Sequence, residues 1–366
     1  MKKKILALLL ACVMVMGLTA CGGNDNSTAA DNSGPGNNIQ ANDNSGPGNN
    51  IQPADNNNYS GNDIHVDDST PSDGGQSFTV GICQLAPHPA LDAATQGFKD
   101  ALTEKLGGSV EFKEGNAGGE SNNCIPIVDG FISENVDLIL ANATSPLQTA
   151  ASATSTIPVL GTSVTDYATA LGIENWTGTV GSNVSGTSDL APLEQQAEML
   201  HEMFPEAKNV GMLYCSGEPN SVYQVEVVTA ALEGMGYTCA NFAFTDANDI
   251  TSVTQSACDS CDVIYVPTDN TAANNTEAIA NVVIPAGVPV VAGEEGICSG
   301  CGVVTLSISY YDIGHIAGEM AYDILANGAD VTTMPVQFAP EVTKKYNAAN
   351  CEALQIAVPD DYEAIG

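Results

Sequence analysis

Polar and acidic side chains recur directly after short apolar runs from residue 78 onward. In an open parallel α/β sheet, ligands bind beyond the carboxyl ends of the strands, so the residues at those positions decide the chemistry. They are Gln84, His88, Asp92, Asn142, Thr144, Ser145, Thr165, Asp166, Glu218, Asn220, Ser221, Thr268, Asp269, Asn270, Thr271, Glu294, Glu295, Tyr310 and Tyr311. A single Ser, Thr, Asn or Asp there could be a helix N-cap. Carboxylates at several such positions exceed what capping requires, and they indicate a polar binding site.

The charge of the chain narrows the class of ligand. It holds 44 acidic and 9 basic residues, a formal charge of −35, which makes nucleic acids and anionic membranes poor partners. All nine basic residues are lysines. Without arginine, a bidentate guanidinium clamp on a carboxylate or phosphate cannot form. Phosphate, sulfonate and dicarboxylate ligands are therefore disfavoured, and a zwitterion or a neutral solute fits better.

The polar residues must be positioned by alternating strands and helices. Short β-branched runs alternate with helical patterns from Phe78 onward, which predicts parallel βαβ units. Expected strands are 78–83, 109–113, 137–141, 157–161, 209–214, 238–244, 262–266, 288–292, 303–307 and 334–338. Expected helices are 88–106, 122–134, 146–154, 190–204, 220–235, 248–257, 272–284 and 311–327.

Two successive series with the same rhythm predict two doubly wound, Rossmann-like lobes in an α/β fold. The helical pattern at 311–327 has no place in the second series, so we expect the chain to cross back to the first lobe. This gives a three-crossover hinge, with lobe 1 formed by 78–206 and 306–332 and lobe 2 by 207–305 and 333–366. The alternative is a pair of ordinary α/β domains joined by one crossing.

The N-terminus has the pattern of a secretion signal. Three lysines precede an apolar run at 5–16 that is too short to span a bilayer. Leu-Thr-Ala then precedes Cys21, as at the cleavage site of bacterial lipoproteins. An ordinary signal peptide with an incidental cysteine is the alternative. We expect residues 1–20 to be removed and Cys21 to be lipidated, which would hold the protein on the extracytoplasmic face of the cell membrane.

Residues 21–77 have the composition of a tether. They are mainly Asn, Asp, Gly, Ser, Pro and Ala, and one nonapeptide occurs twice, at 32–40 and 44–52. Such a segment cannot bury enough apolar surface to offset the entropy of ordering. We therefore expect a disordered spacer between the lipid and the folded part.

The cysteines admit several interpretations. Nine remain apart from Cys12 and Cys21, an odd number. Cys258–Cys261 and Cys298–Cys301 each have C-x-x-C spacing, but the gap between the pairs is too long for a compact zinc knuckle. Structural disulfides or free thiols are favoured, with a structural metal or redox chemistry as alternatives. No cofactor and no metal are expected.

Nine short motifs in order carry a resemblance to a known family. They are Val80-Gly-Ile-Cys-Gln84, His88-Pro-Ala-Leu-Asp92, Gly97-Phe98, Ala143-Thr-Ser-Pro146, Pro158-Val159, Thr165-Asp166, Ser216-Gly-Glu-Pro-Asn-Ser221, Pro267-Thr-Asp-Asn-Thr271 and Tyr310-Tyr-Asp-Ile-Gly314. Over about residues 78–360 the chain resembles the ABC transporter substrate-binding lipoproteins that include proposed tryptophan and tyrosine receptors. The resemblance implies a type I periplasmic binding protein fold, an amino-acid-like ligand, and a permease and an ATPase as partners of a monomer.

Three departures from the family limit what the resemblance carries over. Members usually have a proline where this chain has Tyr167, a Gly-rich turn with more basic residues around 171–181, and a loop without cysteines where it has Cys298 and Cys301. The first changes one wall of the cleft. The identity of the ligand is therefore not transferred.

The hypothesis for the site has one ligand between the lobes. Its α-ammonium is expected to pair with a carboxylate, Asp269 first and Asp166 or Glu218 second. Without arginine, its α-carboxylate is expected on hydroxyls and backbone amides at helix starts. The candidates for that role are Thr144, Ser145, Asn220 and Ser221. The hypothesis requires residues 144, 166, 218 and 269 to face one gap.

Four further residues complete the predicted site. Gln84 and His88 are expected to contact the ligand's side chain or the closing edge of the cleft. Asn270 follows Asp269 directly, and Tyr310, near the hinge, could stack on an aromatic ligand.

Other function classes fit less well. There is no nucleophile elbow, no His-x-x-Glu metal pair and no Walker motif, so catalysis is not expected. A binding protein that presents its ligand to a signalling receptor is an alternative. A nucleoside or sugar ligand is another, but sugar sites usually stack several aromatic rings and this chain has one tryptophan, Trp176.

Overall fold

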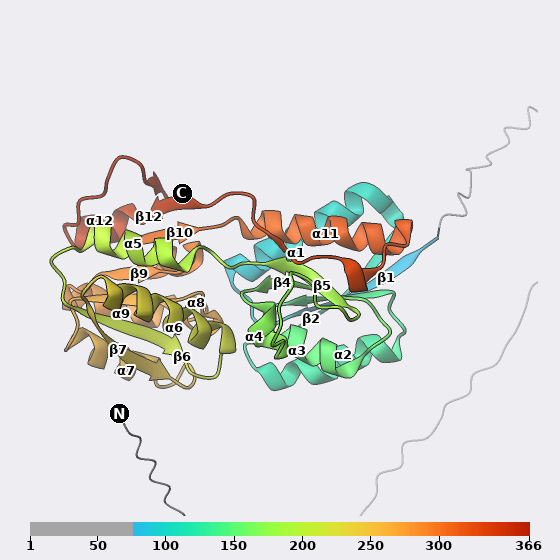
Figure 1. Cartoon of the computed structure of the whole chain (residues 1–366), viewed down its shortest axis with the longest axis horizontal. Helices are drawn as coiled ribbons and strands as arrows, with labels where there is room; N and C mark the ends of the chain where they lie inside the picture. The colour runs from blue at the N-terminus through green and yellow to red at the C-terminus, as the bar shows by residue number, and fades with distance from the viewer. Residues whose placement is uncertain (1–75) are drawn as a thin grey trace, which may run out of the picture. The chain divides into compact units, whose positions relative to one another are not determined.

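The computed structural model describes residues 76–366, which form two α/β lobes (Figure 1). The predicted signal peptide, the predicted lipid attachment at Cys21 and nearly all of the predicted tether lie outside the described residues. Within 76–366, no helix is both long and apolar enough to cross a membrane.

Lobe 1 is built on a six-stranded parallel sheet with the order β11-β5-β4-β3-β1-β2. Its strands are β1 (Phe78–Gln84), β2 (Val110–Asn116), β3 (Leu138–Asn142), β4 (Val159–Val164), β5 (Val184–Ser188) and β11 (Gln337–Phe338). Its helices are α1 (Pro89–Leu106), α2 (Cys124–Ser133), α3 (Thr144–Ala153), α4 (Tyr167–Leu171) and α11 (Tyr310–Asn327). Strands β3 and β4 are buried along their whole length, as expected for a parallel sheet covered on both faces.

Lobe 2 is built on a seven-stranded sheet with the order β13-β12-β10-β9-β8-β6-β7, in which only β10 and β12 pair antiparallel. Its strands are β6 (Asn209–Cys215), β7 (Thr238–Phe244), β8 (Val263–Val266), β9 (Val290–Ala292), β10 (Val304–Ser307), β12 (Thr343–Tyr346) and β13 (Glu363–Ala364). Its helices are α5 (Leu193–Met203), α6 (Pro219–Gly234), α7 (Ile250–Cys258), α8 (Asn270–Ala273), α9 (Thr276–Ala286), α10 (Glu295–Gly300) and α12 (Ala348–Ala353).

The chain passes between the lobes three times, after β5, after β10 and after β11. The predicted fold class, with two doubly wound lobes and a three-crossover hinge, is confirmed. Two of the predicted lobe boundaries are wrong. Helix α5, expected in lobe 1, packs Leu193 and Leu200 into the core of lobe 2 with Val210. Strand β11, expected in lobe 2, pairs with β5 in lobe 1. An apolar pattern indicates that a helix or strand buries one face, but it does not show against which sheet that element packs.

One central strand was not predicted from the sequence. Strand β5 reads Val-Ser-Gly-Thr-Ser and lacks an apolar run, yet every residue in it is buried. The hydroxyl of Ser185 donates to Met334 O, that of Thr187 to Thr162 Oγ1, and that of Ser188 to Thr165 O. Because these hydroxyls are satisfied inside the lobe, a polar sequence can occupy a buried strand.

Helices α1 and α11 lie side by side on lobe 1 (Figure 1). Two glycines permit this close approach. A Cβ atom on Gly97 would lie 2.1 Å from the carbonyl oxygen of Tyr311, and one on Gly314 would lie 2.0 Å from that of Ala94. The helix that follows the second crossing is thus held directly against the helix that opens lobe 1.

Replacing Gly314 by alanine should force these helices apart. We expect the free energy of unfolding to fall by about 1–3 kcal/mol, measured by urea titration, because overpacking strains a closely fitted contact. The matched control is Gly130→Ala in α2, where a Cβ would meet nothing within 4 Å. That variant should gain up to about 1 kcal/mol through helix propensity. Equal stability of Gly314→Ala and the wild type would contradict the close contact.

Candidate functional site

A small cavity lies between the lobes, beyond the carboxyl ends of the strands, and we name it the interlobe cavity. Lobe 1 contributes His88, Leu91, Ser163, Thr165, Asp189 and Tyr310. Lobe 2 contributes Asn220, Thr268, Asp269, Asn270, Ala273 and Glu294. Its volume is about 10 Å³, room for about one water molecule. The lobes are therefore closed on each other around a polar centre.

Three buried carboxyl groups meet in the interlobe cavity. Asp189, Asp269 and Glu294 are only 4%, 1% and 3% exposed. Asp189 directly follows β5, and its Oδ2 accepts a hydrogen bond of 2.9 Å from the hydroxyl of Tyr310. The other two carboxylates cap short helices of lobe 2. The interlobe cavity is thus lined by carboxyl groups from both lobes.

The two carboxylates of lobe 2 are fully engaged by backbone amides. Asp269 accepts from the amides of Ala272 at 2.8 Å and Cys215 at 2.7 Å, which ties α8 to the end of β6. Glu294 accepts from the amides of Gly296 and Ile297 at the start of α10. These bonds fix the positions of the side chains within lobe 2, without help from the other lobe.

Burial disfavours the charged form of all three groups. It raises the pKa of Asp269 to about 8, with a further contribution from the nearby Glu218 carboxylate. Burial raises the pKa of Glu294 to about 7. It also raises the pKa of Asp189, although the nearby hydroxyl groups of Tyr310 and Thr165 act in the opposite direction. No lysine lines the cavity within residues 76–366, and burial lowers the pKa of His88. The cavity therefore favours an added positive charge.

Three polar atoms around this cavity have no hydrogen-bond partner in the structure. They are Asp189 Oδ1, Ser163 Oγ and His88 Nδ1, and all three side chains are buried. Ser163 also has a backbone φ of +54°, a costly conformation for a residue with a side chain. Buried polar groups are normally satisfied. Their gathering at one point indicates a place for a polar ligand.

Two larger hollows adjoin the interlobe cavity. The first, about 270 Å³, lies toward β2 and α8 and shares Asn270 with it. The second, about 560 Å³, lies beside the starts of α1, α10 and α11 and shares Ala273, Glu294 and Tyr310 with it. We name them the outer hollow and the hinge-side hollow. Separation of the lobes would join them to the cavity.

The predicted site residues divide into three groups. His88, Asn220, Asp269, Asn270 and Tyr310 line the interlobe cavity. Glu218 lines the outer hollow. The remaining five line neither of these two spaces nor the hinge-side hollow; they are Gln84, Thr144, Ser145, Asp166 and Ser221.

Several of those residues are held by contacts within one lobe. Glu218 accepts from the backbone and side chain of both Asn270 and Thr271. Asp166 caps α4 by accepting from the amide of Thr169 at 2.6 Å. The Oγ of Ser145 lies 2.9 Å from that of Ser121. Of residues 144, 166, 218 and 269, only Asp269 lines the interlobe cavity; Glu218 lines the outer hollow, and Thr144 and Asp166 line neither space.

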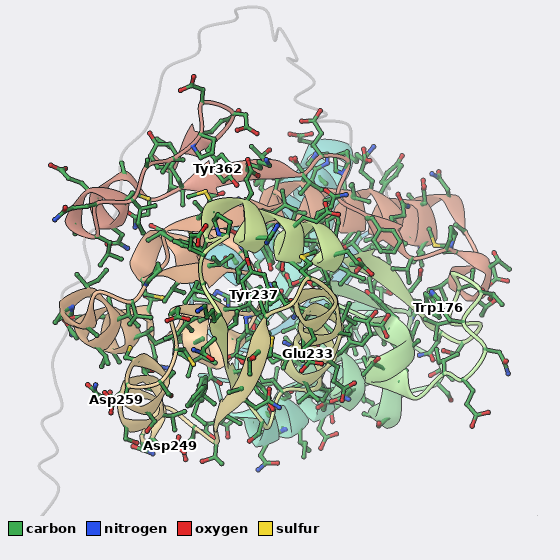
Figure 2. The ribbon with its side chains drawn as sticks, turned by 60° about the vertical axis from the view of Figure 1, so that its left-hand side comes forward. Trp176, Glu233, Tyr237, Asp249, Asp259 and Tyr362 are labelled. Carbon is green, nitrogen blue, oxygen red and sulfur yellow. The ribbon has the colours of Figure 1, made fainter. Side chains whose placement is uncertain are left out.

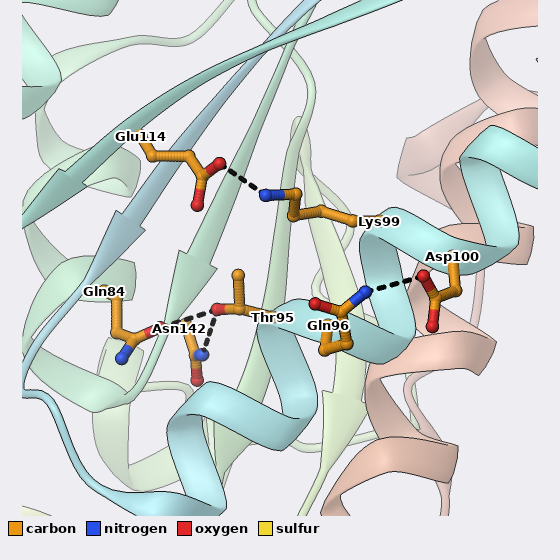
Figure 3. Close-up of polar contacts among 7 residues, drawn as sticks. All are labelled: Gln84, Thr95, Gln96, Lys99, Asp100, Glu114 and Asn142. Carbon is orange, nitrogen blue, oxygen red and sulfur yellow. Dashed lines mark hydrogen bonds and ion pairs between the residues drawn. The ribbon is translucent and has the colours of Figure 1, made fainter. Parts of the chain in front are cut away.

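Gln84 belongs to a network inside lobe 1 (Figure 3). Its Oε1 accepts from the hydroxyl of Thr95 at 2.7 Å, and that hydroxyl accepts from Asn142 at 2.9 Å. Its Nε2 donates to Asp92 at 2.6 Å. The network joins β1, β3 and α1, and it stabilises the end of the sheet from which His88 emerges.

Asp189 and Ser163 were not predicted from the sequence, and Glu294 was not placed in the predicted site. Asp189 follows the strand that lacked an apolar pattern, so no strand end was expected there. Ser163 lies within β4, where a strand residue rather than a strand end lines the cavity, and it has a positive φ. Glu294 was expected directly after a strand, and this signal could have placed it in the predicted site.

The single tryptophan lies away from the cavity. Trp176, labelled in Figure 2, stacks on Tyr167 with ring centroids 6.4 Å apart and packs against the core of lobe 1. Tyr167 is itself buried in the core of lobe 1 and thus serves packing. Aromatic stacking on the ligand would have to come from Tyr310.

All nine cysteines within residues 76–366 are free thiols. Cys298 and Cys301 are buried in the core of lobe 2, and Cys258 packs against that core. The disulfide alternative for the two C-x-x-C pairs is not seen in this part of the chain. No cluster of three or more potential metal-ligating side chains occurs among the described residues.

The chain matches the sequence profile of ABC transporter substrate binding proteins over residues 79–364. It belongs to this family. The family comprises solute-binding proteins and not enzymes, and its members bind small molecules and act with an ABC permease. The predicted resemblance is confirmed at this level.

Three relatives place this substrate-binding protein more closely. A tyrosine-binding protein of Clostridioides difficile (strain R20291) is 30% identical over 358 residues, covering 97% of this chain and 93% of the relative. An ABC domain from Streptococcus pneumonia in complex with L-Trp is 28% identical with a TM-score of 0.76, covering 79% of this chain and 100% of that one. A ligand-free, open substrate binding protein with adhesive properties from Clostridium difficile is 32% identical with a TM-score of 0.61, covering 79% and 99%.

The two solved structures differ in how well they match. This chain superposes better on the tryptophan complex than on the ligand-free, open protein, although it is more identical in sequence to the latter. The small volume of the interlobe cavity likewise indicates that the lobes lie close together. The structure thus represents the closed arrangement of the lobes.

The raised pKa of Glu294 gives a prediction for stability against pH. A carboxyl group that titrates near pH 7 in the folded protein binds its proton more tightly than in the unfolded chain. Its contribution is complete at low pH and is lost as the pH rises from about 4.5 to about 7, by up to about 3 kcal/mol. In Glu294→Gln this loss should disappear, so the unfolding free energy should fall less between pH 5 and pH 7.

Urea titrations at pH 5, 6 and 7 would measure the difference in slope between the variant and the wild type. The control is Glu233→Gln on the exposed side of α6, labelled in Figure 2, which should keep the wild-type slope. An unchanged slope in Glu294→Gln would show that this carboxyl does not hold its proton in the folded protein.

Proposed function

We propose that this protein is the extracytoplasmic, lipid-anchored receptor of an ABC importer and that it binds an aromatic amino acid. The observation that carries the proposal is the unpartnered Oδ1 of Asp189, buried between two closed lobes. A buried carboxylate oxygen without a partner is costly unless a ligand supplies a donor. Two relatives, a tyrosine-binding protein and a protein in complex with L-Trp, support the class of ligand.

The ammonium of the amino acid would pair with Asp189. Tyr310 already orients this carboxylate through Oδ2, so Oδ1 is fixed in direction and available. Leu91, Ala273 and the ring of Tyr310 offer apolar surface next to it for the aromatic side chain. Pairing with the ammonium, the role predicted for Asp269, is thus assigned to Asp189, whose Oδ1 has no partner.

Binding and closure would be one equilibrium. The interlobe cavity is too small for an amino acid, so the ligand must enter while the lobes are apart, and the bound form must hold them farther apart than they lie in this structure. The ligand then stabilises that bound form by contacts with both lobes that the open form lacks. His88 of lobe 1 already faces Asn270 of lobe 2 at 3.3 Å, a contact that closure completes. A permease would recognise the closed pair of lobes and receive the ligand.

The predicted lipid anchor fits this role. A receptor that acts with a membrane permease gains from being held near it, because tethering raises its local concentration. Cleavage before Cys21 and its diacylation remain predictions. Mass spectrometry of the mature N-terminus, purified from membranes, would test them directly.

Replacing Asp189 by asparagine should abolish tight binding of aromatic amino acids. The change keeps the shape and removes the charge, and loss of one member of a buried pair costs about 3–5 kcal/mol, or at least about 100-fold in Kd. Isothermal titration calorimetry with tyrosine and tryptophan would measure it.

The control is Asp166→Asn, which alters an N-cap outside the cavity and should leave Kd within a few-fold of wild type. The reverse outcome, a large loss in Asp166→Asn and none in Asp189→Asn, would assign the ammonium to Asp166, one of the two residues predicted second for that role. Similar thermal stability of both variants would show that the comparison reports binding.

A further inference from the structure

We propose that the negative charge of the two lobes opposes their closure, and that ionic strength therefore controls ligand binding, with added salt strengthening it. This inference rests on the proposed function, because closure around a ligand is the step that the charge opposes. It does not depend on which end of the ligand each residue contacts. Its basis is the position of the charged side chains relative to the boundary between the lobes.

The lysines form ion pairs only within one lobe. The part of the chain that the structure describes contains 36 acidic residues and six lysines. Lys99, Lys105 and Lys113 are paired inside lobe 1. Lys344 and Lys345 are paired inside lobe 2. No ion pair in this part of the chain joins the lobes, so each lobe keeps a large negative charge as the other approaches.

Carboxylates of both lobes line the outer hollow. Glu120 belongs to lobe 1, and Asp246 and Glu218 belong to lobe 2. Glu120 and Asp246 are exposed, and no lysine or histidine is among the described residues that line this hollow. Closing the lobes therefore brings these carboxylates closer together without a positive charge between them.

A second meeting of carboxylates lies where α4 of lobe 1 contacts α6 of lobe 2. Burial raises the pKa of Tyr223 in α6, and the nearby carboxylates of Asp166 in lobe 1 and Glu194 in lobe 2 raise it further. Acidic side chains from opposite sides of the boundary thus lie close to the same hydroxyl group.

The interlobe cavity repeats this arrangement with Asp189 from lobe 1 and Asp269 and Glu294 from lobe 2. In the adjoining hinge-side hollow, Lys345 is already paired with Glu295 at 2.5 Å. At three places along the boundary, acidic groups of the two lobes therefore approach each other, and within residues 76–366 no lysine lines the interlobe cavity or the outer hollow.

Salt acts differently on the attraction and on the repulsion. The proposed pair of a ligand ammonium with Asp189 is buried, and salt screens buried pairs little. An amino acid has no net charge, so long-range attraction to the acidic protein contributes little to its binding. The exposed carboxylates at the boundary repel each other over about 30 Å at about 10 mM salt, but over only about 8 Å at about 150 mM. The repulsion therefore decides the sign, and added salt favours closure.

Calorimetry with tyrosine and tryptophan on the mature protein at pH 7.5 would test the inference. One pair of like charges about 10 Å apart in water changes an equilibrium by about a factor of two. Since several such groups approach each other, we expect Kd to fall at least about threefold when NaCl is raised from about 10 to about 150 mM. A Kd that stays constant or rises with salt would overturn the inference.

Two double variants with the same net charge would locate the effect. The boundary variant, Glu120→Gln with Asp246→Asn, neutralises one carboxylate on each side of the outer hollow. The remote variant, Glu233→Gln with Asp259→Asn, neutralises two exposed carboxylates of lobe 2 that line none of the three spaces and are labelled in Figure 2.

At about 10 mM NaCl the boundary variant should bind about two- to threefold more tightly than the wild type, and its Kd should depend less on salt. The remote variant should match the wild type. Equal effects in the two variants would assign the salt dependence to the total charge of the protein and would overturn the inference.

The outcomes separate this inference from the proposed function. If amino acids bind and Kd does not fall with salt, the inference fails and the proposed function stands. If none of the twenty amino acids binds at any salt concentration, the proposed function fails. Small-angle X-ray scattering of the two ligand-free variants at low salt then decides on the inference. A smaller radius of gyration in the boundary variant would support it, and equal radii would overturn it.

Discussion

An incompletely satisfied carboxylate at the boundary between the lobes is the constraint on which the rest of this structure depends. Asp189 has one oxygen bound by Tyr310 and the other without a partner, in a place that water reaches poorly. A buried carboxylate oxygen without a partner is tolerated only if another interaction stabilises the protein by more free energy than the burial costs. In a closed two-lobed protein, a ligand with a positive group can do so, and closure then depends on the ligand.

The position of this carboxylate connects it with the hinge. Asp189 lies directly after β5, where the chain first leaves lobe 1, and Tyr310 opens α11, just after the second crossing. Their hydrogen bond therefore joins two of the three crossing segments. Helix α11 is in turn fixed to α1 where Gly97 approaches Tyr311 and Gly314 approaches Ala94. A positive group bound at Asp189 therefore acts directly on segments that connect the lobes. Ligand recognition and lobe closure thus depend on the same side chains.

The architecture could be predicted from the sequence because it depends on patterns that repeat. Alternating β-branched and helical runs gave both lobes, and the surplus helix at 311–327 revealed the return crossing. His88, Asp269 and Tyr310 were found for the same reason, since each follows a recognisable strand. Asp189 was missed because β5 is buried through its hydroxyl groups and lacks an apolar signal.

The roles of individual acidic residues were harder to predict. Asp166, Glu218 and Asp269 follow strands in the same way, and an aspartate that caps a helix has the same local sequence as one that binds a ligand. Only the positions of Thr169, Asn270 and Ala272 show that these carboxylates accept from backbone amides of their own lobe. That information is tertiary, and spacing along the chain does not contain it.

The nine thiols of the folded part have a consequence for how the protein matures. Its two cores hold together by packing and hydrogen bonds, and no covalent cross-link joins their elements. Folding would then require neither an oxidising enzyme nor an isomerase to sort cysteine pairs. The native form could be reached in the complete absence of oxygen.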